Sequence, residues 1–313
     1  MKIVIVAKSK RHTKIYYYFK KAFQQKGHKT FWIKFSKIKS YLGENLAYAI
    51  CYKVISLLKP DLLFFHGRDI SFELLMQVKQ RTPAVMYFDD CLKSISSSNF
   101  EELIMLARQA DIMYLTNRGE LPQYQKQGVN AKFITGGCDP DAHYKVEKPE
   151  KFYQSEVAFI GKVNTSERTE CMREVAKHFD LKLWGEEWEK VGMKSMMKHV
   201  YAAEYRKICA GAKIILGWNI DPTIDLYFSN RTWYTLGCGG FLLTAYSPSL
   251  EEIFDRRVEL DWFESIEECC EKIRYYLQHD KERKKIAETG YHLAHTKYSY
   301  AEMVKKIIED VSQ

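Results

Sequence analysis

The chain has 313 residues, which is enough for two domains that each bury a core. Apolar residues make up 46% and charged residues 28%, as in a soluble globular protein, and no apolar run is long enough to span a bilayer. The eight cysteines have no paired CxxC spacing, which argues against a zinc or disulfide framework and favours a reducing, cytoplasmic location. The first residues predict a strand rather than a signal peptide.

The net charge of +8 is unevenly distributed along the chain. Residues 1–150 carry 24 Lys and Arg against 14 Asp and Glu, whereas residues 151–313 carry 24 against 26. Residues 1–59 hold 14 basic side chains and a single acid, Glu44. This asymmetry predicts a surface that meets an anionic partner, such as a glycan, a phosphorylated lipid, a membrane face or a nucleic acid. A solvated basic face is the alternative.

Short apolar strands alternate with helical segments from the N-terminus onward. A helix is expected at about 13–25, and a longer one ends at Lys59. The strands are predicted at 4–7, 30–35, 62–67, 84–88, 112–116 and 132–135. This rhythm is typical of an α/β domain with a doubly wound parallel sheet, in which ligands bind beyond the carboxyl ends of the strands.

Residues 145–155 are charged, contain Pro149 and lack apolar periodicity, so they are the expected linker. The prediction is therefore an N-terminal Rossmann-like domain at 1–150 and a second one at 151–313. The second half begins another alternation, with strands at 157–160, 181–184, 214–218 and 241–244. Its helices are expected at 166–179, 202–211, 266–278, 281–295 and 300–311.

Polar residues follow several strands of the first half, where a ligand would bind. His66 ends one strand, and Asp89 and Asp90 follow another. Each is a candidate for holding a sugar hydroxyl or accepting a proton, with a structural role as the alternative. The first strand is followed by a basic loop without glycine, so the dinucleotide fingerprint and the Walker A loop are both absent. That loop supplies candidate acceptor-side residues, namely Lys8, Lys10, Arg11 and His12.

The second half carries the candidates for phosphate binding. Gly161 permits close approach of the backbone, while Lys162 and Arg168 can neutralise phosphate. Asn219 is a polar residue at another strand end. The segment 229–244 reads as a short capped helix that runs into a buried strand, with Asn230 and Arg231 at its start and Gly239 and Gly240 at its end. It predicts a diphosphate site, although a plain helix-to-strand connection explains the same residues.

Several segments, in order, resemble the GT-B glycosyltransferases, in particular the CgeB-like, spore-maturation branch related to glycosyltransferase family four. They are KPDLLFFHG, AVMYFDD, DIMYLTN, GGCDPDAHY, VAFIGKVNTSER, AKIILGW, SNRTWYTLGCGGFLLT and the stretch from IEECCEKIRYY to HTKYSY. The resemblance implies two facing Rossmann-like domains and a last helix that crosses back to the first domain. It also implies that Arg168 and Arg231 contact the donor phosphates and that Gly239 and Gly240 close the Arg231 helix.

The family's glutamate, which holds the ribose of the donor, would fall at Tyr234 and is missing. The resemblance implies a metal-independent transferase without a cofactor. It would move a sugar from a nucleotide-diphosphate sugar with retention. The charge asymmetry predicts that the acceptor is anionic or anion-adjacent, and peripheral membrane contact is a further expectation. Two alternatives stay open: a nucleic-acid glycosyltransferase that uses the basic N-terminal residues, and an inactive nucleotide-sugar-binding module.

Overall fold

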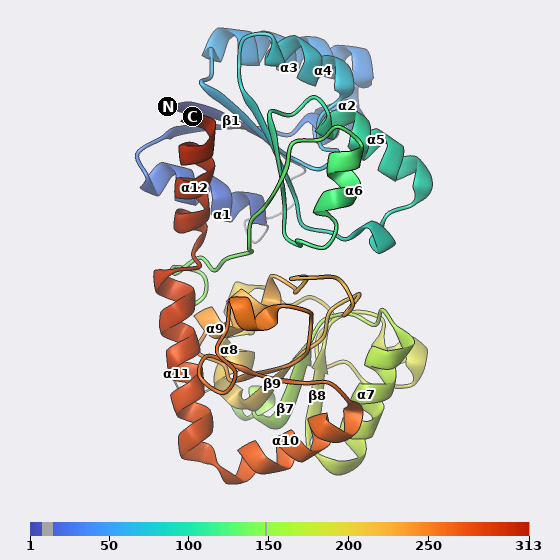
Figure 1. Cartoon of the computed structure of the whole chain (residues 1–313), viewed down its shortest axis with the longest axis vertical. Coiled ribbons are helices and arrows are strands. Elements are labelled where there is room, and N and C mark those ends of the chain that lie inside the picture. The colour runs from blue at the N-terminus through green and yellow to red at the C-terminus, as the bar shows by residue number, and fades with distance from the viewer. Residues whose placement is uncertain (8–14, 148, 313) are drawn as a thin grey trace. The chain divides into compact units, whose positions relative to one another are not determined.

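The computed structural model describes residues 1–7, 15–147 and 149–312 (Figure 1). The chain divides into two compact units. The first unit comprises Met1–Thr135 together with Tyr300–Gln313, and the second comprises Gly136–Ser299. The predicted basic loop with Lys8, Lys10, Arg11 and His12 lies outside the described residues.

The first unit is built on a six-stranded parallel sheet with the strand order β2-β1-β3-β4-β5-β6. Its central strands are continuous runs of buried apolar residues, because helices cover both faces of such a sheet. The strands are β1 (Lys2–Val6), β2 (Lys29–Ile33), β3 (Leu62–His66), β4 (Ala84–Phe88), β5 (Ile112–Leu115) and β6 (Ala131–Phe133).

Helices from both ends of the chain cover one face of this sheet. The centroid of the buried Phe19 ring lies 4.9 Å from that of Phe64 of β3 and 5.1 Å from that of Tyr300 of the last helix. The C-terminal residues therefore complete the core of the first unit. The helices of this unit are α1 (Ile15–Gln25), α2 (Phe35–Leu42), α3 (Glu44–Leu58), α4 (Phe72–Lys79), α5 (Ser97–Ala107), α6 (Leu121–Lys126) and α12 (Tyr300–Ser312).

The long helix expected before Lys59 is two helices. Gly43 separates them with φ 77°, a left-handed conformation that ends α2. The two helices pack against each other as a hairpin. The apolar pattern continues across this break, which is why periodicity alone did not reveal it.

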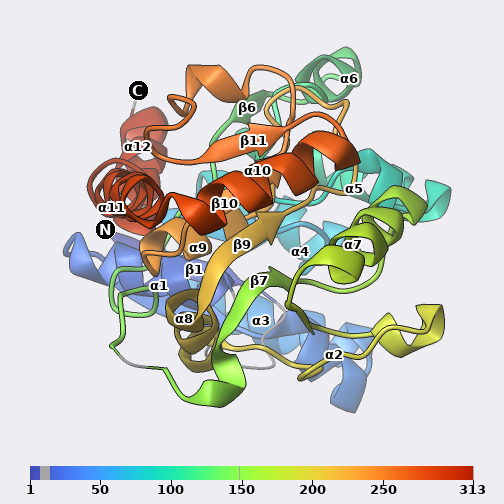
Figure 2. The ribbon, with the colours of Figure 1, turned by 90° about the horizontal axis from the view of Figure 1, so that it is seen from below.

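The second unit has a five-stranded parallel sheet with the order β11-β10-β9-β7-β8. The strands are β7 (Ser155–Ile160), β8 (Leu181–Trp184), β9 (Ala212–Gly217), β10 (Leu242–Ala245) and β11 (Asp261–Phe263), of which β11 was not predicted. Figure 2 shows α10 crossing the strands of this sheet with α7 beside it. The helices are α7 (Ser166–His178), α8 (Ala202–Gly211), α9 (Arg231–Gly237), α10 (Ile266–Gln278) and α11 (Asp280–Thr296).

The second unit begins before the charged linker. The amide of Cys138 donates to the carbonyl of Tyr298 at 3.0 Å, and its thiol donates to the carbonyl of Ala294 at 3.3 Å. The His143 ring stacks on Tyr234 of α9. These contacts place residues 136–147 in the second unit, whereas composition placed the domain boundary at 150.

Two general expectations concern cysteines and membrane spans. All eight cysteines are buried free thiols. Among the described residues, no helix combines the length and apolar character needed to cross a membrane.

Candidate functional site

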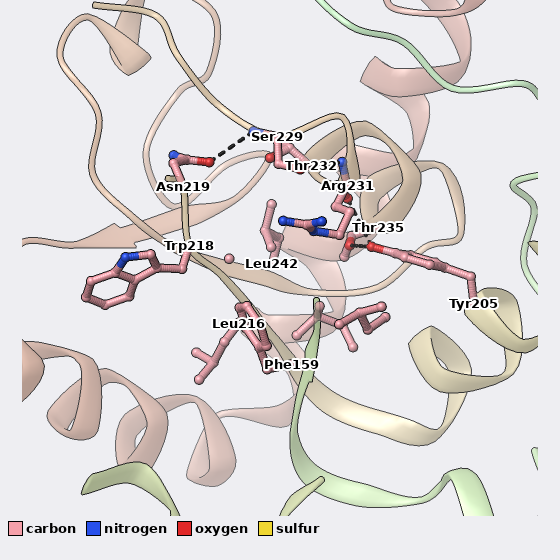
Figure 3. Close-up of a pocket in the computed structure, with 13 residues that line it drawn as sticks. Phe159, Tyr205, Leu216, Trp218, Asn219, Ser229, Arg231, Thr232, Thr235 and Leu242 are labelled. Carbon is pink, nitrogen blue, oxygen red and sulfur yellow. Dashed lines mark hydrogen bonds between the residues drawn. The ribbon is translucent and has the colours of Figure 1, made fainter. Parts of the chain in front are cut away.

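A pocket lies at the carboxyl ends of β7 and β9 in the second unit (Figure 3). The order of the sheet reverses between these two strands, since β8 follows β7 on one side and β9, β10 and β11 follow on the other. Ligands of doubly wound sheets bind at such a switch point. The pocket is lined by Phe159, Ile160, Tyr205, Ile215, Leu216, Gly217, Trp218, Asn219, Ser229, Arg231, Thr232, Thr235 and Leu242.

Arg231 is the first residue of α9, and its guanidinium extends into this pocket (Figure 3). The Tyr205 hydroxyl of α8 supports the helix, because it donates to the carbonyl of Arg231 at 3.2 Å and lies 2.8 Å from Oγ1 of Thr235. Among the described residues, the Arg231 guanidinium has no hydrogen-bond or ion-pair partner. A cation is therefore presented to the pocket with all of its donors available.

A buried network fixes the loop that leads into Arg231. Oδ1 of Asn219 accepts from the amide of Ser229 at 2.9 Å, and its Nδ2 donates to Oγ of Ser247 at 2.9 Å. The Ser247 hydroxyl in turn donates to the carbonyl of Tyr227 at 2.9 Å. Ser229 Oγ also accepts the amide of Arg231 at 3.3 Å. The amide of Asn219 is thus engaged within the protein at both ends, so it holds the loop.

Arg168, in the first turn of α7, is buried with only 1% of its surface exposed. Its Nη1 donates to the carbonyl of Lys162 at 2.9 Å, and its Nη2 donates to the carbonyl of Trp218 at 3.1 Å. Burial, together with the nearby charge of Arg231, lowers the pKa of Arg168 to about 10. The buried side chain ties the turn after β7 to the residues that follow β9.

The guanidinium groups of Arg168 and Arg231 are thus near enough to repel each other, and among the described residues neither is paired with a carboxylate. Nε of Arg168 has no hydrogen-bond partner, and in the described part of the chain neither Arg168 nor Arg231 forms an ion pair. Buried charges in proteins are normally paired or bound to an ion, because removing them from water is costly. An anion such as a diphosphate would supply the missing negative charge.

The turn that follows β7 brings backbone close to Arg231. A Cβ placed on Gly161 would lie 3.0 Å from the ring of Phe159 and, at an ordinary contact distance, 3.5 Å from Cζ of Arg231. The carbonyl of Gly161 accepts from Nε1 of the buried Trp188 at 2.8 Å. Gly185 has φ 138°, and a Cβ there would lie 2.3 Å from that same carbonyl oxygen. Lys162 is exposed beside the turn, with its side chain in solvent.

The end of α9 follows the predicted pattern. Gly239 has φ 71°, the left-handed conformation expected there, and Gly240 joins it to β10. The ring of Tyr234 stacks on His143 with a centroid distance of 4.2 Å and an interplanar angle of 6°. Asn230 precedes the helix with its side chain against the backbone of Gly136, and it makes no capping hydrogen bond. The position that the resemblance assigns to a glutamate therefore belongs to an aromatic stack.

The first unit has a second polar cluster, again at a switch point, where β1 and β3 are neighbours. Nε2 of His66, at the end of β3, lies 2.8 Å from Oδ1 of Asp89, which follows β4. The Tyr16 hydroxyl of α1 lies 3.1 Å from Nδ1 of His66. Burial favours neutral His66, but the hydrogen bond and charge of Asp89, with Asp69 and Asp90, raise its pKa overall. The cluster can hold a proton on a partly buried imidazole.

The structure joins some predicted residues and adds others. His66 and Asp89, predicted separately, form one hydrogen-bonded pair, while Asp90 is exposed beside them. Tyr16 and Tyr205 were not predicted. Each is a helical residue whose hydroxyl reaches a strand-end site only after its helix packs on the sheet, and nothing in their local sequence marks that contact.

Residues 167–309 match a family model described as glycosyl transferase-like. No curated protein sequence matches the chain. Among solved structures, Anabaena HepE in complex with UDP-glucose is similar with a TM-score of 0.70 and 13% identity, over 100% of this chain and 99% of that one. A sucrose-phosphate synthase from Thermosynechococcus elongatus has a TM-score of 0.68 and 10% identity, over 99% and 98%.

A third similar structure is a glycosyltransferase from Rickettsia africae, with a TM-score of 0.70 and 12% identity, over 99% of this chain and 97% of that one. At these identities the likeness shows the fold, and the fold is that of the GT-B enzymes expected from the sequence. The narrower CgeB-like assignment stays a prediction. The chain therefore has the GT-B fold, and its residues 167–309 are similar to the glycosyl transferase-like family.

Proposed function

We propose that this protein transfers a sugar from a nucleoside-diphosphate sugar, which binds at the carboxyl ends of β7 and β9. The observation that carries the proposal is the pair Arg168 and Arg231 at the switch point of the second sheet, two guanidinium groups that have no carboxylate partner in the described ranges of the chain. The UDP-glucose complex of the similar HepE structure supports a nucleotide-sugar donor and makes UDP the first nucleotide to test.

In the proposed reaction the bond between the anomeric carbon and the diphosphate oxygen breaks, and the diphosphate leaves with the bonding electrons. Arg231 would bind the departing diphosphate directly, with Lys162 beside it, and their charges would stabilise it. Arg168 and Asn219 act as positioning residues, since both are buried and hydrogen-bonded to the loops that surround the pocket. Fixed cations can perform this task, so the proposal includes transfer without a metal ion, which activity in excess EDTA would test.

The acceptor side of the proposal rests on the first unit. A base for the acceptor hydroxyl is part of the proposal, and His66, which is hydrogen-bonded to Asp89, is the candidate in the first unit. Asp90 would bind acceptor hydroxyls. The excess of basic residues in the first 59 positions supports an anionic or anion-adjacent acceptor, with Lys8, Lys10, Arg11 and His12 as the loop that meets it. Retention of the anomeric configuration rests on the family resemblance, and NMR of the product would test it.

One observation favours a second candidate, a nucleotide-sugar-binding module without transferase activity. Tyr234 stacks on His143 at the position where the resemblance places the carboxylate for the donor's ribose. A phenol offers one hydroxyl, whereas a carboxylate accepts two hydrogen bonds from a ribose diol. Sugar transfer or slow donor hydrolysis by the purified protein would exclude this module.

Calorimetric titration of the purified protein with UDP, UDP-glucose, GDP-mannose and uridine tests the donor site. We expect a nucleoside diphosphate to bind at least about tenfold more tightly than the nucleoside, because Arg231, with Lys162 beside it, would bind the diphosphate. Release of the nucleoside diphosphate should then be measured in the presence of candidate acceptors. Equal affinity for uridine and UDP, or no binding of any nucleotide at millimolar concentration, would refute the proposal.

A further inference from the structure

Helix α3 of the first unit is apolar on two adjacent sides, one buried and one exposed. Ala47, Cys51 and Ile55 recur every fourth residue and are buried against the sheet. The solvent side carries four further large apolar side chains, whose exposed fractions are 50% for Leu46, 36% for Ile50, 41% for Val54 and 75% for Leu57. A surface helix normally carries polar residues on its outer face, so α3 has an apolar stripe that the fold does not cover.

Helix α2 extends this stripe across the hairpin. Tyr41 is 75% exposed and Leu42 is 48% exposed. A groove of about 540 Å³ runs between the two helices, and Trp32, Ile38, Tyr41, Leu42, Ile50 and Val54 are among the residues that line it. Contiguous apolar surface of this kind on a soluble domain marks an interaction site.

Lysines border the apolar stripe. Lys34 and Lys37 line the same groove, and Nζ of Lys37 lies 5.8 Å from the centre of the Tyr41 ring. Lys53 is exposed on α3 beside Val54. Among the described residues, none of the three lysines has an ion-pair partner. We call this surface the apolar-basic face, defined by Tyr41, Leu42, Leu46, Ile50, Val54, Leu57, Lys34, Lys37 and Lys53.

Acidic groups are almost absent from the two helices. Glu44 is their single carboxylate, and its Oε1 forms an ion pair with Nζ of Lys39 at 2.7 Å. On the neighbouring α4, Glu73 lies across a separate groove together with Tyr48 and Met76. The face is therefore complementary to a surface that is anionic outside and apolar beneath.

We propose that the apolar-basic face docks the protein on an anionic phospholipid bilayer. Exposed leucine, isoleucine and valine side chains would enter the boundary between head groups and acyl chains, as the apolar side of an interfacial helix does. Tyr41, which is 75% exposed, has the amphipathic ring that favours this depth. The lysines would extend their charged ends to the lipid phosphates. The inference stands on the first unit alone and does not depend on the donor site.

Vesicle co-sedimentation of the full chain tests the proposal. The vesicles contain either phosphatidylcholine alone or phosphatidylcholine with about one third phosphatidylglycerol. We expect the protein to bind the anionic vesicles and to be released by about 0.5 M salt, because each lysine near the surface contributes about fivefold in affinity at low salt. Absence of binding to anionic vesicles, or equal binding to neutral ones, would overturn the proposal.

Two variants test the face itself. Tyr41→Ser/Leu57→Ser replaces side chains that are each 75% exposed, so the fold should be retained, and vesicle affinity should fall by about tenfold or more. Lys34→Gln/Lys37→Gln/Lys53→Gln should weaken binding by about a hundredfold. Unchanged affinity in both variants would contradict the proposal.

Matched controls lie in the second unit. The pair Phe152→Ser/Val258→Ser alters exposed apolar residues, at 42% and 43%, and should leave vesicle binding within about twofold. The charge control alters three exposed lysines in the same way, Lys194→Gln/Lys198→Gln/Lys281→Gln. Light scattering provides the remaining check, because self-association that is lost in Tyr41→Ser/Leu57→Ser without any vesicle binding would assign the face to a second copy of the chain.

Discussion

Replacing Arg231 with glutamine should stabilise the ligand-free protein and weaken nucleotide binding at the same time. The Arg231 guanidinium has no partner among the described residues, so the substitution removes no hydrogen bond from the free protein. It does remove a like charge near the buried Arg168, whose pKa is lowered to about 10 by burial and by Arg231. A lowered pKa for a base means that folding disfavours its cation, and at pH 7.5 this cost is present in full.

The magnitude follows from the charges. Two unit charges roughly 6 to 12 Å apart repel by about 1 to 3 kcal/mol at an effective dielectric constant of about 20. Removing about 1 kcal/mol of repulsion should raise the melting temperature by about 2 to 4 °C for a unit of this size. The bound state behaves in the opposite way, because charge-assisted hydrogen bonds from one guanidinium fork contribute about 3 kcal/mol to diphosphate binding, which is about a hundredfold in affinity.

The assay is differential scanning calorimetry of Arg231→Gln with and without UDP, combined with isothermal titration at pH 7.5. Arg274→Gln is the matched control, since Arg274 is exposed on α10, and both its stability and its UDP affinity should stay close to those of the original protein. A lower melting temperature for ligand-free Arg231→Gln would refute the electrostatic argument. A UDP affinity within about threefold of the original would refute the assignment of Arg231 to the diphosphate.

Two further perturbations test the pair in the first unit and the turn beside Arg231. Asp89→Asn should lower the pKa of His66, because the hydrogen bond and charge that raise this pKa are lost while burial remains. NMR titration of the imidazole should show its midpoint move to lower pH. An unchanged midpoint would contradict the pairing of His66 with Asp89. Gly185→Ala would place a Cβ 2.3 Å from the carbonyl oxygen of Gly161 at φ 138° and should destabilise by about 3 kcal/mol or more in chemical unfolding. Gly192→Ala is its control, because Gly192 has φ 75° but open space around it, so about 1 kcal/mol is expected; equal losses would contradict the steric argument.

The architecture could be predicted from the sequence because both sheets are parallel and buried on both faces. Such strands are short apolar runs, and the segments Leu181–Trp184, Ala202–Gly211 and Ile266–Gln278 have the predicted bounds. Strand β11 was missed because it has three residues and begins with an aspartate. The buried Asp261 carboxylate accepts from Lys272 and Tyr276 of the later helix α10, at 2.8 Å and 2.7 Å, and from Arg256 at 3.1 Å, and these contacts form only in the folded chain.

The site residues could be predicted from the sequence where they follow the rule that ligands of doubly wound sheets bind beyond the carboxyl ends of the strands. This rule located His66, Asp89 and Arg231, which do lie after strands or at the start of a helix beyond them. It could not show that the side chain of Arg168 turns inward to bind two carbonyl oxygens, since that depends on how the loops after β7 and β9 meet. Tyr16 was not predicted as a site residue for the same reason, because its contact with His66 requires α1 to lie on the sheet.

The arrangement of the two arginines gives Tyr234 a physical explanation. Arg168 is fixed by the protein, so it supplies a positive field that needs no reorganisation when an anion arrives, and Arg231 keeps its donors for the ligand. A glutamate at position 234 would stand three residues after Arg231 on α9 and would offset part of that positive charge. Tyrosine leaves the charge intact and secures α9 by stacking on His143. The substitution therefore weakens the expected recognition of the ribose while it strengthens attraction for the diphosphate, so the proposed donor would be bound mainly through its phosphates.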